Sequence, residues 1–277
     1  MPSITLATPI SPEGWAETLI GGQCFRWRSD PEKINGFRGQ IDGHALTLSL
    51  SGSKIFWDQK RLSARSLKRY LAIDTQYADA WEALPWRSDP QLKSAMDAFQ
   101  GLRILRQPVE EVLFCFLCSS VKSIPQIKQM LESVCRDFGD PIEGDQYSFP
   151  GWDTLREIGE TPLRERKLGY RAKFIAQTAS RVSSDYFETL KSTDYANART
   201  MLMDLPGVGE KIADCVSLFG LGHLEAFPVD TWIAQAMQNL YALDGWTLPQ
   251  VAQFGRTHFG AYAGLAQQFL FSFARSR

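Results

Sequence analysis

The amino-acid sequence predicts an α+β fold in which an antiparallel β-sheet is followed by helices. Residues 24–58 consist of short runs of aromatic and β-branched residues separated by turn signals, which is typical of strands joined by hairpins. After Ser63 the apolar residues recur at helical spacing instead. Because strands precede helices, we predict an N-terminal β-sheet domain with helices over residues 1–98 and a helical domain of two subdomains over residues 99–277.

The individual elements follow from the turn signals and the apolar spacing. Asn35-Gly36, Asp42-Gly43 and Ser51-Gly52-Ser53 divide the first region into three or four strands with tight turns. Apolar faces at helical spacing predict helices over residues 109–117 and 127–138. Further helices are expected to begin near Arg171, Tyr195, Glu210, Asp230, Leu248 and Tyr262.

The composition is that of a packed globular protein. The chain has 277 residues, of which 44% are hydrophobic, 12% aromatic and 22% charged, so a disordered or collagen-like chain is excluded. The longest apolar run, residues 112–118, is far shorter than the roughly 20 residues that a membrane span needs. The N-terminus lacks the basic and apolar regions of a secretory signal. We therefore expect a soluble, non-exported protein without a membrane partner.

The cysteines and the net charge say less about function. Five cysteines without a secretory signal indicate reduced thiols, since an odd number cannot all pair within one molecule. Cys115 and Cys118 have the spacing of a zinc-binding pair, but no second pair follows, so a place in an apolar helix face is favoured. The net charge of −1 neither favours nor excludes a polyanionic partner.

Residues 201–237 carry the most informative pattern. A helix that ends at Leu205, a Pro-Gly-Val-Gly turn and a second helix from about Gly209 predict a helix, a hairpin and a helix. Gly207 and Gly209 allow the backbone to approach another surface, and the free N–H groups at a helix start can bind phosphate. A plain connection between two helices is the alternative interpretation of this turn.

Lys211 and Asp230 are the candidate catalytic residues within this pattern. Lys211 lies in the first turn of the second helix, where the positive end of the helix dipole disfavours another positive charge. A neutral lysine amine can attack carbon and form a Schiff base. Asp230 is expected to cap the next helix, which would by itself explain an aspartate there. A carboxylate near the amine could also stabilise cationic charge in a transition state.

These motifs resemble the helix-hairpin-helix superfamily of DNA glycosylases. In LPGVGEKIADC and FPVD, the lysine and aspartate of the family's catalytic pair correspond to Lys211 and Asp230. Four further blocks are similar to the 8-oxoguanine DNA glycosylase branch and follow in its order: GGQCFRWR from Gly21, FQGLRILRQPVEEVLFCFLCSS from Phe99, LGYRAKF from Leu168 and YAGLAQQFLFS from Tyr262. The resemblance spans almost the whole chain.

The resemblance implies a fold, an activity and a substrate. The expected fold is an N-terminal TBP-like sheet domain followed by a mainly helical domain pair with the hairpin motif. The expected enzyme is a bifunctional glycosylase and AP lyase that excises 8-oxoguanine from double-stranded DNA through a lysine Schiff base. β-Elimination at the abasic site then cuts the strand. An alkylated-base glycosylase and a noncatalytic helix-hairpin-helix DNA-binding protein remain the alternatives.

The resemblance also implies a pocket for the flipped base. Oxidation of guanine at C8 turns N7 into an N–H donor, and the family's glycine carbonyl that accepts it corresponds to Gly22. Cys215 and Phe271 match the residues that enclose the base, and Gln267 matches the glutamine that reads its Watson–Crick edge. Because Cys215 follows Lys211 by one helical turn, both should project from one face. Taken singly, these residues would instead be interpreted as core or surface residues.

Five positions are candidates for DNA contact outside the pocket. Tyr170 matches the tyrosine wedge that fills the space left by an extruded nucleotide, and Arg171 matches an arginine that contacts the orphaned cytosine. Lys122 stands where eukaryotic members have an asparagine run and is a further DNA-binding candidate. Lys167, Arg171 and Lys173 are expected to form a basic strip facing DNA, unless they form only a solvated face.

This chain departs from the eukaryotic pattern in several places. Val121-Lys122-Ser123 stand where eukaryotic members have an asparagine run, and a second cytosine-reading arginine of those members falls near Gln126. From Val121 and Gln126 we predict only a mild preference for cytosine opposite the lesion. Trp232 replaces a histidine, and Ala274 replaces the aspartate that would partner it. We expect the Trp232 indole to contact the base-binding site, by packing against the lesion nucleotide or against Phe271.

The expected cofactor requirement is small. No cofactor is required by the resemblance, although family members bind a metal ion through hairpin carbonyls, here those of Met203, Leu205 and Val208. An iron–sulfur cluster is disfavoured because no cysteine follows Cys215. The protein is expected to be a monomer that acts in the bacterial cytoplasm at the nucleoid, or in the nucleus if the source is a eukaryote.

Overall fold

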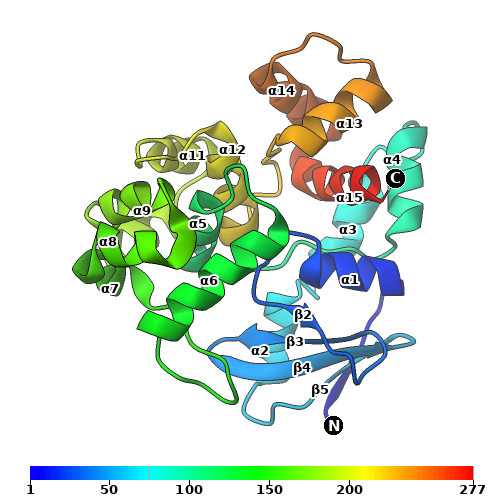
Figure 1. Ribbon diagram of the computed structural model, residues 1–277. Coiled ribbons are helices and arrows are strands. Elements are labelled where there is room, and N and C mark those ends of the chain that lie inside the picture. The colour runs from blue at the N-terminus through cyan, green and yellow to red at the C-terminus, as the bar shows by residue number, and fades with distance from the viewer. Residues whose placement is uncertain (74, 277) are drawn as a thin grey trace.

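The computed structural model describes residues 1–73 and 75–276 and shows a sheet on one side of a large helical region (Figure 1). The sheet is antiparallel with the strand order β1-β5-β4-β3-β2. Its strands are β1 Ser3–Thr5, β2 Arg28–Ser29, β3 Gly36–Ile41, β4 His44–Ser51 and β5 Lys54–Trp57. The predicted α+β class is confirmed, and so are the strands expected between residues 24 and 58. The short strand β1 was not predicted.

The turns form where the sequence places Asn or Asp before Gly. Asp42 and Gly43 have φ angles of 48° and 74° and connect β3 to β4. Two consecutive positive φ values match a hairpin turn whose twist suits the flanking strands. The pairing of Ile41 with His44 fixes the register of the two strands.

Fifteen α-helices are described in residues 1–73 and 75–276. They are α1 Pro12–Ile20, α2 Ala64–Tyr70, α3 Thr75–Ala83, α4 Pro90–Ala98, α5 Val109–Leu117, α6 Ile124–Phe138, α7 Gly151–Ile158, α8 Glu160–Leu163, α9 Arg171–Ala179, α10 Ser184–Lys191, α11 Tyr195–Met203, α12 Glu210–Val216, α13 Thr231–Tyr241, α14 Leu248–Phe259 and α15 Ala263–Arg275. Helix α12 continues into a π-helical turn, Ser217–Leu221. None of the described helices has the length and apolar character that crossing a membrane requires.

Two hydrophobic cores hold the molecule together. The first lies under the sheet and contains the fully buried side chains of Trp15, Trp27 and Leu48. The second joins the helices, from Tyr77 on α3 to Leu270 on α15. Helices α3 and α4 thus contribute to the helical core, although they precede the predicted boundary after residue 98.

Candidate active site

Lys211 is partly buried in the first turn of α12. Its Nζ donates to Ser119 Oγ at 3.0 Å and lies 5.0 Å from the centroid of the Phe116 ring. The Ser119 hydroxyl donates its own proton to the Phe116 carbonyl at 2.7 Å, so its oxygen is left to accept from the amine. Among the described residues, no carboxylate oxygen lies within 4.0 Å of Nζ. The amine is therefore positioned without an ion pair.

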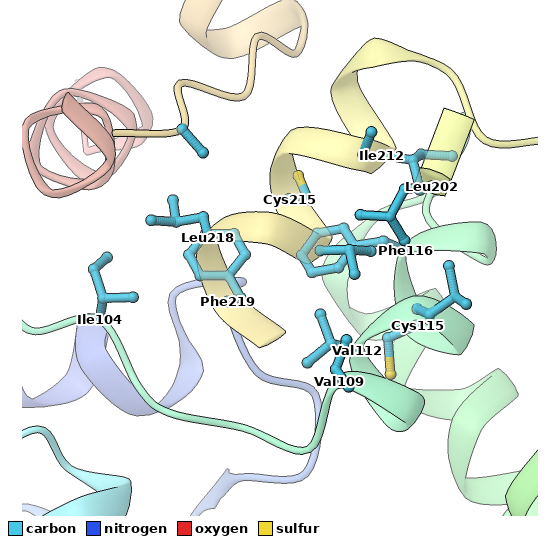
Figure 2. Close-up of a cluster of buried hydrophobic side chains, with 14 of the residues drawn as sticks. Ile104, Val109, Val112, Cys115, Phe116, Leu202, Ile212, Cys215, Leu218 and Phe219 are labelled. Carbon is cyan, nitrogen blue, oxygen red and sulfur yellow. The ribbon is translucent and has the colours of Figure 1, made fainter. Parts of the chain in front are cut away.

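A layer of packed aromatic side chains, which we call the aromatic floor, lies next to the Lys211 amine. Phe116 stacks on Phe219 with centroids 5.5 Å apart, and Phe25 contacts the other side of Phe116 edge-on at 5.6 Å. Figure 2 shows Phe116 and Phe219 packed against the helix that carries Cys215. Phe25 follows the predicted base-reading glycine by three residues, so this floor connects the lysine to the glycine loop. Phe116 and Ser119 were not predicted as site residues, although both lie in the block that begins at Phe99.

Cys215 lies one turn after Lys211 on α12 and is buried. Burial raises the pKa of the Cys215 thiol to about 12, the Lys211 amine opposes this rise, and the Asp230 carboxylate adds to it. The thiol is therefore neutral at neutral pH. Because the Lys211 and Asp230 side chains both influence this one thiol, the three residues lie near one another. We call these three residues the catalytic half of the site.

Asp230 caps α13, as predicted. Its backbone is extended, with φ −103° and ψ −173°, and its Oδ1 accepts from the Ile233 N–H at 2.9 Å. No described donor engages the second carboxylate oxygen. The cap thus fixes the side chain through one oxygen and leaves the other for a positive charge in the site.

Gly22 lies against Phe271 from the far end of the chain. A methyl group on Gly22 would lie 2.8 Å from Ile124 Cδ1 and 3.6 Å from Phe271 Cε1, and the φ angle of Gly22 is 109°. The positive φ favours glycine at this position, whereas the contact with Ile124 involves only the flexible end of that side chain. None of the described donors bonds to the Gly22 carbonyl, which leaves it free to accept a hydrogen bond from a ligand.

Gln267 and Phe271 lie one turn apart on α15. Gln267 is only 5% exposed, and its Oε1 has no hydrogen-bond partner among the described residues. A buried amide oxygen without a partner is unfavourable and is expected where a ligand supplies the missing donor. Phe271 is half-buried at the edge of the helical core. We call Gly22, Gln267 and Phe271 the base-reading half of the site.

Gln23, which was not predicted to have a role, anchors the glycine loop. Its Nε2 donates to the Arg103 carbonyl at 2.7 Å, and its Oε1 accepts from the Leu105 N–H at 2.8 Å. Gln107 Nε2 donates to the Gln23 carbonyl at 2.8 Å. The sequence signal that could have indicated this anchor is a glutamine directly after two glycines.

Trp232 does not pack against Phe271. It is 52% exposed at the start of α13, and no ring contact between these two side chains occurs in the described part of the chain. Of the two predicted contacts for the indole, packing against Phe271 is therefore absent in this structure. The second alternative, contact with a bound nucleotide, stays a prediction.

The predicted DNA-contacting residues differ in their placement. Tyr170 is 52% exposed and is supported edge-on by Phe174 at a centroid distance of 6.2 Å. Arg171, in contrast, is only 4% exposed, and its guanidinium donates to the carbonyls of Ser120 and Leu168. The Arg171 side chain is thus turned into the protein in this structure, and its predicted contact with the orphaned cytosine stays a prediction.

The loop before α6 holds the other candidates. Lys122 is half-buried, while Val121 is 94% exposed with a positive φ of 52°. Gln126 is engaged in a capping box, in which its Oε1 accepts from the Ser123 N–H at 3.0 Å. The amide oxygen of the exposed Gln126 side chain is therefore engaged at the start of α6.

The hairpin has the predicted form, although α11 ends at Met203 and not at Leu205. Gly207 has a φ of 78°, and a methyl group there would lie 2.7 Å from Phe174 Cγ, so a side chain is excluded. Gly209 is the N-cap of α12. The described residues contain no group of three or more His, Cys, Asp or Glu side chains that could hold a metal ion.

A buried cluster of charged side chains connects α12 to the neighbouring helices. Asp214 is 1% exposed and accepts from Tyr195 Oη at 2.7 Å and Arg199 Nε at 3.0 Å. Arg256 on α14 adds a guanidinium nitrogen 3.8 Å from the other carboxylate oxygen. Burial raises the pKa of Asp214, although the tyrosine hydroxyl and the two arginines counteract this. The cluster joins α11, α12 and α14, and sequence spacing gave no sign of it.

Comparisons with known proteins agree with this arrangement. The family model described as the N-terminal domain of 8-oxoguanine DNA glycosylase matches residues 13–113. The N-glycosylase/DNA lyase OGG1 of Arabidopsis thaliana is 31% identical over a 278-residue alignment that covers 92% of this chain and 75% of the plant protein.

Two solved structures superpose on nearly the whole chain. MBOgg1 in complex with a low-affinity DNA ligand has a TM-score of 0.90 and 31% identity, with 99% of this chain and 95% of that one covered. The Clostridium acetobutylicum 8-oxoguanine glycosylase/lyase, in complex with double-stranded DNA containing cytosine opposite 8-oxoguanine, has a TM-score of 0.88 and 29% identity, with 100% and 98% covered. From the identity and coverage of these relatives, the chain belongs to the 8-oxoguanine DNA glycosylase family.

Proposed function

We propose that this protein is a bifunctional DNA glycosylase and AP lyase that excises 8-oxoguanine from double-stranded DNA. The observation that carries the proposal is the placement of the Lys211 amine. It is partly buried, it is held by a serine hydroxyl, and no described carboxylate pairs with it. A surface lysine with a structural role would instead be exposed or ion-paired.

Recognition of the lesion depends on one hydrogen atom. The Gly22 carbonyl accepts the N7–H of 8-oxoguanine, whereas the N7 of guanine would place an acceptor against an acceptor. The unpartnered Oε1 of Gln267 accepts from the Watson–Crick edge of the base. Cys215 and Phe271 enclose the base from its two faces. The neutral Cys215 thiol makes an apolar contact in this arrangement.

The chemistry uses the catalytic half. The Lys211 amine attacks C1′ of the sugar as the bond to the base breaks, and the Asp230 carboxylate stabilises the positive charge that develops on the sugar. Loss of a proton from nitrogen and opening of the sugar ring give a Schiff base between Lys211 and C1′. Removal of a C2′ proton then expels the 3′-phosphate, which is β-elimination, and hydrolysis releases the lysine.

The hairpin supports binding of the DNA backbone. Gly209 keeps its surface free of a side chain, Gly207 allows close packing on Phe174, and Tyr170, which also contacts Phe174, is exposed as a wedge. The carbonyls of Met203 and Val208 accept no described hydrogen bond, and that of Leu205 accepts only from the Val208 N–H at 3.1 Å. These oxygens therefore fit a hard cation, which would bring positive charge to the phosphate.

Selectivity for the opposite base is expected to be weak. Gln126 is committed to the capping box and Arg171 is turned inward, so neither side chain reads the orphaned base in this structure. Excision rates on duplexes with cytosine, adenine, guanine or thymine opposite the lesion test this expectation. We expect a preference of severalfold for cytosine, whereas a hundredfold preference would contradict it.

Trapping with borohydride tests the proposed mechanism. Reduction of the Schiff base should cross-link the wild-type protein to a duplex containing 8-oxoguanine. The Lys211→Gln variant should give no cross-link, while Lys68→Gln, a matched change on the exposed face of α2, should cross-link normally. A wild-type protein that never cross-links, or a Lys211→Gln variant that still does, would refute the mechanism. Excision without cross-linking would indicate the water-based reaction of an alkylated-base glycosylase.

A further inference from the structure

A polar bridge joins α1 to α15 behind the base-reading half. Arg275 Nη1 donates to the Gly21 carbonyl at 2.7 Å and lies 3.6 Å from Glu17 Oε2. The same carboxylate oxygen accepts from Ser272 Oγ at 2.8 Å. The guanidinium carbon lies 5.1 Å from the centroid of the Phe271 ring. We call Glu17, Ser272 and Arg275 the Glu17–Arg275 bridge.

The local geometry is adapted to this bridge. A methyl group on Gly21 would lie 2.4 Å from both the backbone oxygen and Oε2 of Glu17. Glycine at this position thus allows the carboxylate to fold over the end of α1. The side chains of Arg275 and Glu17 are 29% and 23% exposed, so the ion pair is partly shielded from water. Each charged group also has its own hydrogen bond, Arg275 to the Gly21 carbonyl and Glu17 from the Ser272 hydroxyl, and hydrogen bonds to charged groups are the stronger ones.

The bridge is anchored beside two residues that would contact the base. Gly21 directly precedes Gly22, and Ser272 directly follows Phe271. We propose that the Glu17–Arg275 bridge sets the distance between the Gly22 carbonyl and the Phe271 ring, and that Arg275 is therefore a positioning residue for base selection. The proposal rests on the proposed function, because it takes Gly22 and Phe271 as contacts of the flipped base. The contacts described for Arg275 are with Gly21, Glu17 and Phe271, none of which belongs to the catalytic half.

The proposal separates the two reactions of the enzyme. Excision needs a correctly seated base, whereas cleavage at a preformed abasic site needs Lys211 but no base. Arg275→Met keeps the apolar stem over Phe271 and removes the charge and the hydrogen bond. We expect single-turnover excision of 8-oxoguanine to fall about ten- to a hundredfold. Cleavage at a preformed abasic site should stay within about twofold of wild type, because the catalytic half is unchanged.

Three further variants control for stability and charge. Arg275→Lys keeps a positive charge and should recover part of the excision rate. Glu17→Gln should lower excision in the same direction by about threefold, and it carries the test if Arg275→Met does not fold. Arg156→Met is the matched control, since Arg156 is likewise paired with an acid and bonded to the carbonyls of Ala179 and Val182. This variant should leave the ratio of the two activities unchanged.

The outcomes distinguish this proposal from the proposed function. A wild-type protein with neither activity would refute the proposed function itself. The positioning role alone would be refuted if the wild-type protein had both activities and the Arg275→Met variant lost both by the same factor. It would also be refuted if neither activity fell in that variant. A selective loss of excision in Arg275→Met, with partial recovery in Arg275→Lys, would support it.

Discussion

The catalytic half and the base-reading half of the site are built in different ways. The catalytic half comes from residues 211–230, where one helical turn and one helix cap bring the groups together. The base-reading half joins residue 22 to residues 267 and 271, which meet only through tertiary packing and the Glu17–Arg275 bridge. The comparison teaches that the Lys211–Asp230 pair and the Gly22 loop rest on separate supports, with Cys215 as the one proposed base contact on the helix that carries Lys211. Substitutions should therefore be able to separate excision from strand cleavage.

The largest effect is expected from Asp230→Asn in the catalytic half. Asparagine still caps α13, so the free energy of unfolding should change by less than about 0.5 kcal/mol. The loss of negative charge should slow both excision and cleavage at an abasic site on the order of a hundred- to a thousandfold. Single-turnover kinetics on both substrates and thermal unfolding measure these effects.

The same change at another helix cap is the control. Asp194 caps α11 by accepting from the Asn197 N–H at 3.1 Å and lies outside the site. Asp194→Asn should leave both rates unchanged. If Asp230→Asn slowed excision alone, the separation of the two halves would be wrong.

A smaller and more selective effect is expected from Gly22→Ala. The added methyl group would approach Ile124 Cδ1 to 2.8 Å and strain a backbone with a φ of 109°. Displacement of the glycine carbonyl by about 1 Å should slow excision roughly a hundredfold. Cleavage at a preformed abasic site should continue at nearly the wild-type rate.

Gly52→Ala separates this loss from backbone strain. Gly52 has a φ of 56°, and nothing lies within 4 Å of a methyl group placed there. This control should lower stability without affecting either reaction. Equal loss of both reactions in Gly22→Ala would show that the glycine loop also positions the lysine.

A moderate effect on both reactions is expected from Ser119→Ala. The substitution removes the hydroxyl that holds Lys211 Nζ at 3.0 Å. A net hydrogen-bond contribution of about 1.4 kcal/mol corresponds to roughly tenfold slower excision and cleavage. The affinity for DNA, measured by fluorescence anisotropy, should stay the same. Ser192→Ala removes a similar hydroxyl-to-carbonyl bond, 2.9 Å long, away from the site and should change neither rate.

The smallest effect concerns the protonation of Cys215. Because burial raises the pKa of this thiol to about 12, it stays protonated at neutral pH and reacts slowly with iodoacetamide. The labelling rate, followed by mass spectrometry, should rise about tenfold per pH unit from pH 8 to pH 11. A plateau near pH 9 would indicate a thiolate and therefore a charged contact in the catalytic half.

The sequence predicted the features that depend on neighbours along the chain. The cap at Asp230 and the shared face of Lys211 and Cys215 follow from helical spacing, and the hairpin follows from its glycines. Features that depend on distant partners were missed. Arg171 looked like a surface residue because nothing nearby in the sequence indicates the Ser120 carbonyl that binds it. The Glu17–Arg275 bridge was missed for the same reason, because its residues lie far apart in the sequence.

The short strand β1 was missed for a different reason. Its three residues, Ser3–Thr5, are too few to establish an alternating pattern, and they become a strand by pairing with β5. The positions of Trp232 and Tyr170 were correctly expected near helix starts. Whether these two side chains contact DNA depends on the bound duplex, and the residue pattern of the free chain does not describe that duplex.

The capping box at the start of α6 links repair fidelity to folding. An arginine in place of Gln126 would supply a guanidinium able to read a base on the opposite strand, but it would also lose the bond to the Ser123 N–H. Loss of one such hydrogen bond costs about 1 kcal/mol, and the Ser123 N-cap itself is retained. A lineage evolving toward a stricter choice of base pair would then need a compensating substitution in the first turn of this helix. The effect of a substitution at Gln126 is therefore expected to depend on the residue at the compensating position in the first turn of α6.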